Sequence, residues 1–282
     1  MNAGGAARKE GVPFSIGRSL LIAQTTVRDA LRQRLLVALA LLAACFMGAA
    51  HWLRELNFGS SELTLIADFG LGTMTFFGGV LMVASGAQLF LGEVEARTAA
   101  TVLAKAVWRS EFVVGKFFAI AAIAGAFCAA MGAVLAAVLW TREAALMRQF
   151  PDAFANGSLV ATAPLAAAVL VQWLKLVLLA ALLLLLASFA RSQLFVITTG
   201  VLVWAICELQ QVAPAARGAS VVMRGFAGLV GMLFPNFQRF DLAAGAGLTV
   251  DGAGLLRLAL YAGGYAVVVC ALATLSFRRR EI

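Results

Sequence analysis

The chain has 282 residues, of which 62% are hydrophobic and 13% are charged, and its formal net charge is +8. Soluble domains are about 45–50% apolar and about 25% charged, so a single soluble core could not bury this much apolar surface. An intrinsically disordered chain is also excluded, because disordered chains are poor in hydrophobic residues and this chain is rich in them. The composition therefore predicts a polytopic membrane protein, with room for about six helices at roughly 20 residues per span.

The N-terminal segment lacks the apolar core and cleavage site of a signal peptide. Between Phe14 and Arg34, apolar residues recur at helical spacing and alternate with arginines. This pattern predicts a basic helix lying on the membrane surface, with an ordinary solvated helix as the alternative. We favour the surface helix because it runs directly into the first apolar stretch. The apolar positions are Leu20, Ala23, Val27 and Leu31, and the basic ones are Arg18, Arg28, Arg32 and Arg34.

Six continuous apolar stretches predict six transmembrane helices. They are too long and too uniform for the alternating strands of a β-barrel. We therefore expect an all-α integral membrane protein in which residues 1–282 form a single transmembrane domain. The predicted spans cover about 35–53, 69–91, 117–140, 164–190, 194–212 and 258–277.

The connections between the spans differ in length. Spans four and five are joined only by Arg191-Ser192-Gln193, which predicts a tight hairpin. The segment 213–257 is long, and its apolar stretch Val221–Phe237 is interrupted by Arg224, glycines and Pro235. This stretch is too short to span fully, so we expect a re-entrant or surface-lying helix pair before the last span.

Basic residues are distributed unequally between the two sides of the predicted membrane domain. Fourteen Lys and Arg residues fall on the side of both termini and of loop 92–116, and seven fall on the other side. Because basic residues accumulate on the cytoplasmic side, both termini and this loop are predicted to be cytoplasmic. The same rule explains the net charge of +8 without nucleic acid as a partner.

No catalytic or metal-binding constellation is visible. His51 is the single histidine, and the four cysteines fall in separate apolar stretches. A Walker A motif is absent, because Ser110 stands where its glycine is needed and Phe117 where Ser or Thr is needed. We expect no enzymatic activity, no catalytic residue, no metal site and no cofactor in this chain.

Two charged residues lie inside predicted spans. Lys175 precedes Arg191 by 16 positions and Glu208 follows it by 17, so both lie roughly 25 Å from the turn. Charges inside a span usually face a partner or a cavity. We hypothesise that Lys175 and Glu208 pair with each other or flank the outer end of a translocation path. The alternative is that each side chain reaches separately to the headgroups.

Loop 92–116 carries the most informative pattern. Acidic residues come first, a short amphipathic stretch follows, and a basic-aromatic segment leads into span three. Such a surface suits docking into a groove on a soluble partner, whereas a solvated loop is the alternative.

The loop resembles the cytoplasmic loop after the second span in permease subunits of type-2 ABC transporters, although Ala106 replaces the usual proline. Residues 22–34 resemble the family's elbow helix, 233–241 resembles its Pro-Asn-x-x-x-Phe-Asp stretch, and 277–281 resembles its basic C-terminus. The matching loop positions are Glu93, Glu95, Arg97, Thr98, Leu103, Lys105, Val107, Arg109, Glu111, Phe112, Gly115 and Lys116.

The resemblance implies a permease subunit, with export as the predominant direction, in a bacterial cytoplasmic (inner) membrane. It implies two copies of a cytoplasmic ABC ATPase, a second permease copy or homologue, and membrane lipid as partners. The elbow helix and a coupling helix between spans two and three would contact the ATPase. The implied ATPase-coupling residues are Glu93, Glu95, Arg97, Thr98, Leu103, Arg109, Glu111 and Lys116.

Two other functions remain open at this stage. One is an inner-membrane scaffold or anchor that does not transport. The other is an ion-coupled carrier with Lys175 and Glu208 as coupling residues.

Overall fold

The computed structural model describes seven helices of eight or more residues and contains no strand within the described residues. The described residues are 16–49, 62–95, 108–149, 151, 161–209, 228, 231, 234–240 and 252–278. The helices are α1 (Ile16–Leu31), α2 (Arg34–Ala49), α3 (Glu62–Glu95), α5 (Arg109–Gln149), α6 (Thr162–Phe189), α7 (Gln193–Leu209) and α11 (Gly252–Arg278).

Four of these helices, α3, α5, α6 and α11, are long and apolar enough to cross a membrane. A fifth span results if α1 and α2 are counted as one helix pair, bent by 67°. Helix α7 is equally apolar, but its 17 described residues reach only about 25 Å, against a hydrocarbon core of about 30 Å. The predicted all-α membrane class is confirmed. Helices α2 and α7 occupy the positions of predicted spans one and five.

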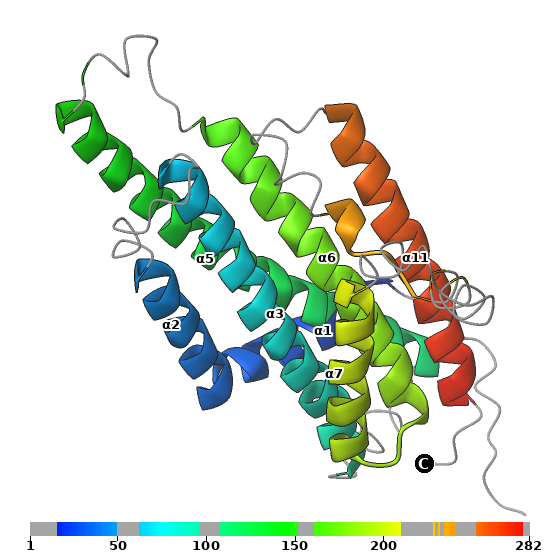
Figure 1. The fold of residues 1–282 in the computed structure, drawn as a ribbon. Coiled ribbons are helices and arrows are strands. Elements are labelled where there is room, and N and C mark those ends of the chain that lie inside the picture. The colour runs from blue at the N-terminus through cyan, green and yellow to red at the C-terminus, as the bar shows by residue number, and fades with distance from the viewer. Residues whose placement is uncertain are drawn as a thin grey trace, which may run out of the picture.

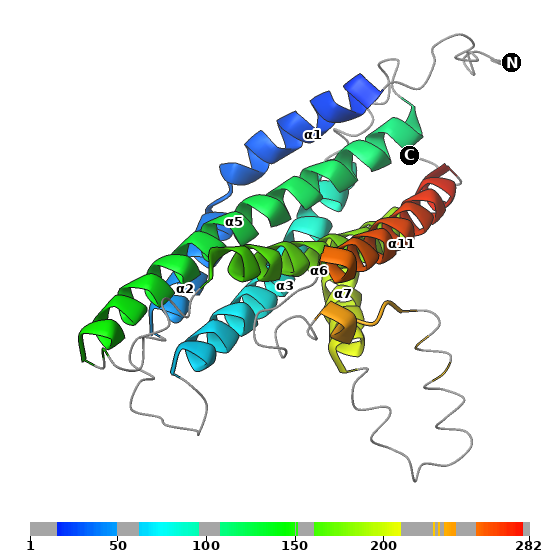
Figure 2. The same cartoon turned by 90° about the horizontal axis from the view of Figure 1, so that it is seen from above.

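Helix α6 lies at the centre of the bundle and contacts α3, α5, α7 and α11 (Figures 1 and 2). Its second half is a nearly unbroken run of leucine and alanine with buried residues on every side. A helix that is apolar all round is stable only when neighbours surround it, which explains its central place.

Helix α1 takes a different direction from the rest of the bundle. Two tight turns end it, in which the Arg32 N–H donates to the Asp29 carbonyl and the Gln33 N–H donates to the Ala30 carbonyl. The chain then turns, so α2 runs beside α3 whereas α1 crosses the bundle and packs on α5 (Figure 1).

Helices α3, α5 and α11 extend beyond the predicted spans at both ends. Gly92–Glu95 belongs to the last turn of α3, and Arg109–Lys116 forms the first two turns of α5. The connection predicted as loop 92–116 is therefore shorter than expected. The core of the expected coupling helix, residues 96–107, lies outside the described residues. So does most of the segment predicted to re-enter the membrane before the last span.

The predicted tight hairpin is present between α6 and α7. Helix α6 ends at Phe189 and α7 begins at Gln193. The Ser192 hydroxyl accepts a hydrogen bond from the Phe195 N–H and so caps the start of α7. We call this end of the bundle the Arg191 end, and the end at which α3 begins the Glu62 end.

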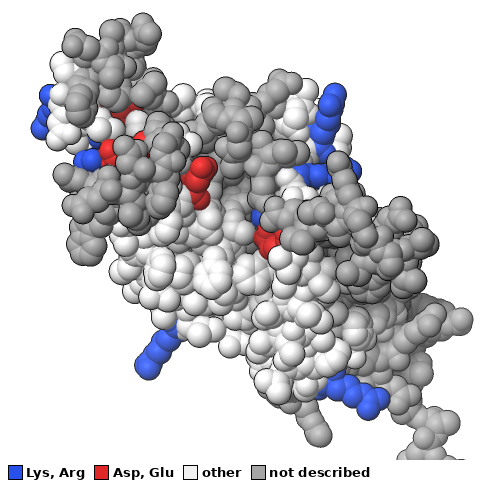
Figure 3. Space-filling model, viewed as in Figure 1, with Lys and Arg blue, Asp and Glu red and all other residues white. Residues whose placement is uncertain are grey.

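Few charged side chains interrupt the described surface in the view of Figure 3, which is mostly uncharged between its two ends. Large apolar side chains such as Leu194, Leu260 and Val267 are more than half exposed. An apolar surface of this extent would aggregate in water and is expected against lipid.

Glycines allow α3 to lie close to its neighbours. A Cβ added at Gly79 would lie 2.3 Å from the Trp204 ring of α7, and one at Gly86 would lie 3.0 Å from the Leu183 Cβ of α6. Membrane helices pack through such small residues because lipid supplies no hydrophobic force to press helices together.

We predict that Gly79→Ala lowers the stability of the purified protein by about 1–3 kcal/mol, because the rigid indole of Trp204 must move away. Thermal unfolding in detergent measures the effect. Gly72→Ala on the same helix is the control, since nothing lies within 4 Å of a Cβ there. Equal melting temperatures for the two variants would contradict the close approach of α3 and α7.

Candidate functional site: a helix clamp and a polar cavity

The start of α5 is held by a buried carboxylate. Glu111 is 0% exposed, and its Oε2 accepts a hydrogen bond from the Trp108 N–H at 3.0 Å. This side chain thereby satisfies a donor at the helix N-terminus. Its other oxygen, Oε1, lies 3.1 Å from Nη2 of Arg18 on α1. The buried charge is therefore compensated across two helices.

Two further residues of α5 fix α1 in place. A Cβ at Gly115 would lie 2.8 Å from the Ser19 carbonyl oxygen, so only glycine permits this crossing without displacement of the α1 backbone. Lys116 is 1% exposed and donates to the Thr26 hydroxyl at 3.0 Å, with the Phe112 ring 5.5 Å from its Nζ. We call Arg18, Glu111, Gly115 and Lys116 the α1–α5 clamp.

Three phenyl rings join the helix ends next to the clamp. Phe90 of α3, Phe112 of α5 and Phe277 of α11 are fully buried, and their ring centroids lie 5.4–5.9 Å apart. Aromatic pairs at this separation contribute beyond the area that they bury. The start of α5 is thus tied to three other helices at the Arg191 end.

The other implied ATPase-coupling residues are distributed around this clamp. The backbones of Glu93 and Glu95 lie in the last turn of α3, and Arg109 is the first residue of α5. Arg97, Thr98 and Leu103 lie outside the described residues. Of the eight implied residues, the structure gives side-chain contacts for Glu111 and Lys116, and both point to α1.

The structure brings the two intramembrane charges together. Lys175 of α6 is 2% exposed, and its Nζ lies 3.1 Å from both carboxylate oxygens of Glu208 on α7. The side chain of Glu208 is 26% exposed and also accepts a hydrogen bond from Trp204 Nε1 at 3.3 Å. The two charges pair with each other and do not extend separately to the headgroups.

The described part of the last connection covers this pair. Phe237 is buried with its ring 5.6 Å from Lys175 Nζ, and Phe240 is also buried. Asn236 orders the turn, because its side-chain oxygen accepts from the Gln238 N–H and its own N–H donates to the Tyr261 hydroxyl of α11. The residues of the Pro-Asn-x-x-x-Phe pattern therefore fasten the segment to α6 and α11.

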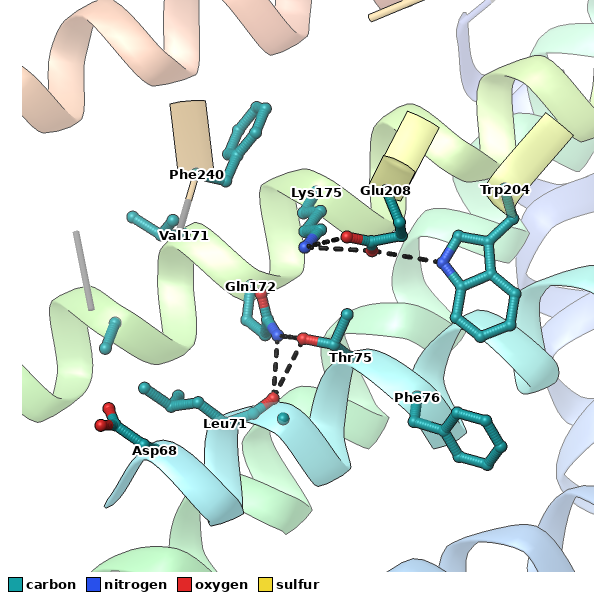
Figure 4. A pocket seen from close by; sticks show the side chains of 12 residues that line it. Asp68, Leu71, Thr75, Phe76, Val171, Gln172, Lys175, Trp204, Glu208 and Phe240 are labelled. Carbon is teal, nitrogen blue, oxygen red and sulfur yellow. Dashed lines mark hydrogen bonds and ion pairs between the residues drawn. The ribbon is translucent and has the colours of Figure 1, made fainter. Parts of the chain in front are cut away.

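A cavity of about 390 Å³ lies between α3, α6, α7 and Phe240 (Figure 4). Gln172, one turn before Lys175, points across it, and its Nε2 donates to the Leu71 carbonyl at 3.0 Å and to the Thr75 hydroxyl. Asp68 lies at the α3 edge of the cavity, and the Phe76 and Trp204 rings, 6.1 Å apart, form its other end.

The sequence indicated Lys175 and Glu208 but not the remaining lining residues. Gln172 was detectable as a polar residue inside an apolar span. Asp68 lies just outside predicted span two, and the aromatic residues resemble ordinary core positions in the sequence. The pairing of distant helices is what places them around one cavity.

No group of three or more His, Cys, Asp and Glu residues able to hold a metal ion occurs within the described part of the chain.

A family model described as "ABC-2 family transporter protein" matches residues 20–209, which is more than half of the chain. The chain belongs to the ABC-2 transporter family. The match covers most of α1 and all of α2 to α7, including the charged pair and the α5 residues of the clamp, whereas Arg18 precedes it. No curated protein matches the chain.

Membership identifies a membrane component of ABC transport, and the resemblance stated from the loop pattern is confirmed. In this family the membrane component is not itself the catalyst, and membership implies an ABC ATPase subunit as its partner. The multi-pass character agrees with the four long apolar helices.

We predict that Arg18→Met destabilises the protein by about 3 kcal/mol, because it leaves the fully buried Glu111 carboxylate without its cationic partner. Arg28→Met is the matched control, since Arg28 is an exposed arginine on the same helix and its loss is expected to change stability by less than about 0.5 kcal/mol. Thermal unfolding separates the two, and equal effects would show that the clamp does not hold α1.

The charged pair predicts an asymmetric double-mutant cycle. Glu208→Gln leaves the buried Lys175 ammonium uncompensated and is expected to be destabilising by roughly 3 kcal/mol. Lys175→Met leaves only the partly exposed Glu208 unpaired and is expected to be milder. The double variant is expected to recover most of the loss, measured by thermal unfolding. Additive effects of the two single changes would contradict a direct pair.

Proposed function

We propose that this chain is the permease subunit of an ABC exporter in a bacterial inner membrane. It crosses the membrane six times, pairs with a second permease copy or homologue, and is driven by two copies of a separate ATP-hydrolysing subunit. The observation that carries this proposal is the family match over residues 20–209, within which Lys116 of α5 donates to Thr26 of α1.

The proposed topology counts α2 and α7 as spans and α1 as an elbow helix on the membrane surface. The steep angle between α1 and α2 supports this assignment, because a surface helix must turn to enter the membrane. The excess of basic residues supports a cytoplasmic location for the Arg191 end. The Glu62 end then faces outward.

Coupling would act through the chain between α3 and α5. Glu93, Glu95, Arg97, Thr98, Leu103 and Arg109 are proposed to contact the ATPase, whereas Glu111 and Lys116 transmit its movement to α1. Helix α5 has 41 residues and is about 60 Å long, so displacement of its start moves the opposite end. There Arg142 of α5 donates to Glu62 of α3, which links the two helices again.

The proposed outer gate is the segment before α11. Among its described residues 234–240, the Phe237 ring lies 5.6 Å from Lys175 Nζ and Phe240 lines the cavity. A small displacement of this segment would open the cavity toward the outside.

Two alternatives are kept. A scaffold without transport would bind the same ATPase, and it is distinguished by the absence of ATP-dependent flux in proteoliposomes. An ion-coupled carrier using Lys175 and Glu208 would transport without any ATPase. Lys175 and Glu208 form an ion pair with each other, so neither charge is left to bind a coupling ion, and this favours the permease over the carrier.

We predict that charge reversal of the proposed contacts abolishes binding of the ATPase. The variants are Glu93→Lys, Glu95→Lys, Arg97→Glu and Arg109→Glu, tested singly and combined. Co-purification with the ATPase and stimulation of ATP hydrolysis are the measurements. We expect a loss of at least about tenfold in association for the combined variant, because repulsive charges replace attractive ones.

Arg148→Glu is the control for this experiment. Arg148 is an exposed residue in the last turn of α5, at the Glu62 end, and is expected to leave association unchanged. Full association and coupling in the combined variant would overturn the proposed contact surface.

A further inference from the structure

We propose that the cavity between α3, α6 and α7 binds a lipophilic organic cation. Its assignment as the substrate site rests on the proposed export function, whereas the binding itself does not. Three properties of the described lining residues carry the inference: their charge, the use of their hydrogen-bond donors, and their aromatic faces.

The ionisable groups of the cavity leave one negative charge uncompensated. Lys175 is neutralised by Glu208 at 3.1 Å. Asp68 is exposed to the cavity, and no described residue forms an ion pair with it or donates a hydrogen bond to it. With both carboxylates ionised, the lining has a net charge of −1, which favours a cationic ligand in an apolar surrounding.

The side-chain donors of the cavity are already used by the protein. The Thr75 hydroxyl donates to the Leu71 carbonyl, and the Gln172 amide donates to that carbonyl and to Thr75. The Trp204 N–H and the Lys175 ammonium both donate to Glu208. An anionic or sugar-like ligand needs several donors and would have to break these bonds, whereas a cation needs only acceptors and π faces.

Aromatic rings supply those faces. Phe76 is 56% exposed, and its ring lies 6.1 Å from the ring of Trp204 in a tilted arrangement. Phe240 lines the cavity from the opposite side, above Val171 (Figure 4). The Phe76 and Trp204 rings form the end of the cavity opposite Asp68. Their faces are electronegative and favour an organic cation with little hydration, while Asp68 supplies the negative charge at the other end.

The cavity has the size and position of a ligand site. Its volume of about 390 Å³ lies within the range of about 300–1,000 Å³ typical for sites that hold drug-sized molecules. Asp68 follows the start of α3 by six residues, and Glu208 precedes the end of α7 by one. Asp68 therefore lies toward the Glu62 end, which faces outward in the proposed orientation, whereas Glu208 lies at mid-depth beside Lys175, midway along α6.

Tetraphenylphosphonium is the probe for this site. Equilibrium dialysis measures its binding to the purified full chain in detergent, with empty micelles subtracted. We expect saturable binding that Asp68→Asn weakens by about fivefold to tenfold, since it removes the uncompensated charge. Phe76→Ala is expected to weaken binding about threefold, because it removes one exposed ring face. Both side chains are exposed, so the variants are expected to fold.

Two controls isolate the charge. Asp29→Asn makes the same chemical change at an exposed position on α1 and is expected to leave binding unchanged. Tetraphenylborate has the same shape as the probe with opposite charge, and in a separate dialysis without the probe it is expected to show no saturable binding. Equal affinity for the probe in the wild type and Asp68→Asn, non-saturable binding of the probe, or saturable binding of tetraphenylborate with a similar affinity would overturn the cation site.

The same preparations separate this inference from the proposed function. Co-purification with the ATPase does not depend on the cavity. A protein that associates with the ATPase but binds no cation refutes the cation site alone. If the protein binds the cation but does not associate with an ATPase, the cation site stands and the permease proposal is refuted.

Discussion

Burying a charged side chain in an apolar helix bundle costs several kcal/mol unless a partner inside the chain compensates it. Glu111, Lys116 and Lys175 are each at most 2% exposed, and each meets this requirement through a residue on another helix. These contacts therefore determine which helices pack against each other and at which position along their length. Two of them hold α1 against α5 at the Arg191 end, and the third joins α6 to α7 midway along α6.

The position of the clamp has a mechanical consequence. A helix that crosses the bundle, as α1 does, would be free to slide if only apolar contacts held it, because such contacts are not directional. The Arg18–Glu111 pair and the close approach at Gly115 remove that freedom. When the start of α5 moves, α1 must then move with it. A partner that binds the connection between α3 and α5 could therefore displace both helices.

The cavity follows from the same constraint. Once Lys175 is paired with Glu208, and Gln172 is bonded to α3, the donors at this depth of the bundle are used. Asp68 remains as an acceptor in a cavity whose opposite end is formed by the Phe76 and Trp204 rings. Because Lys175 and Glu208 neutralise each other, Asp68 is the charged group left to interact with a ligand, and the cavity therefore favours cations.

Composition and apolar runs determined the membrane class, the positions of the helices and the depth of Lys175 and Glu208, because these depend on local spacing along the chain. Four motifs in order along the chain, among them the one around Glu111 and Gly115, also indicated the family. Only the tertiary structure decided that Glu111 and Lys116 face α1, and that Asp68 and Gln172 share a cavity with the charged pair. Helical periodicity defines which face of its helix a residue occupies. Which other helix packs against that face depends on contacts between residues about ninety to a hundred positions apart, and only tertiary packing selects them.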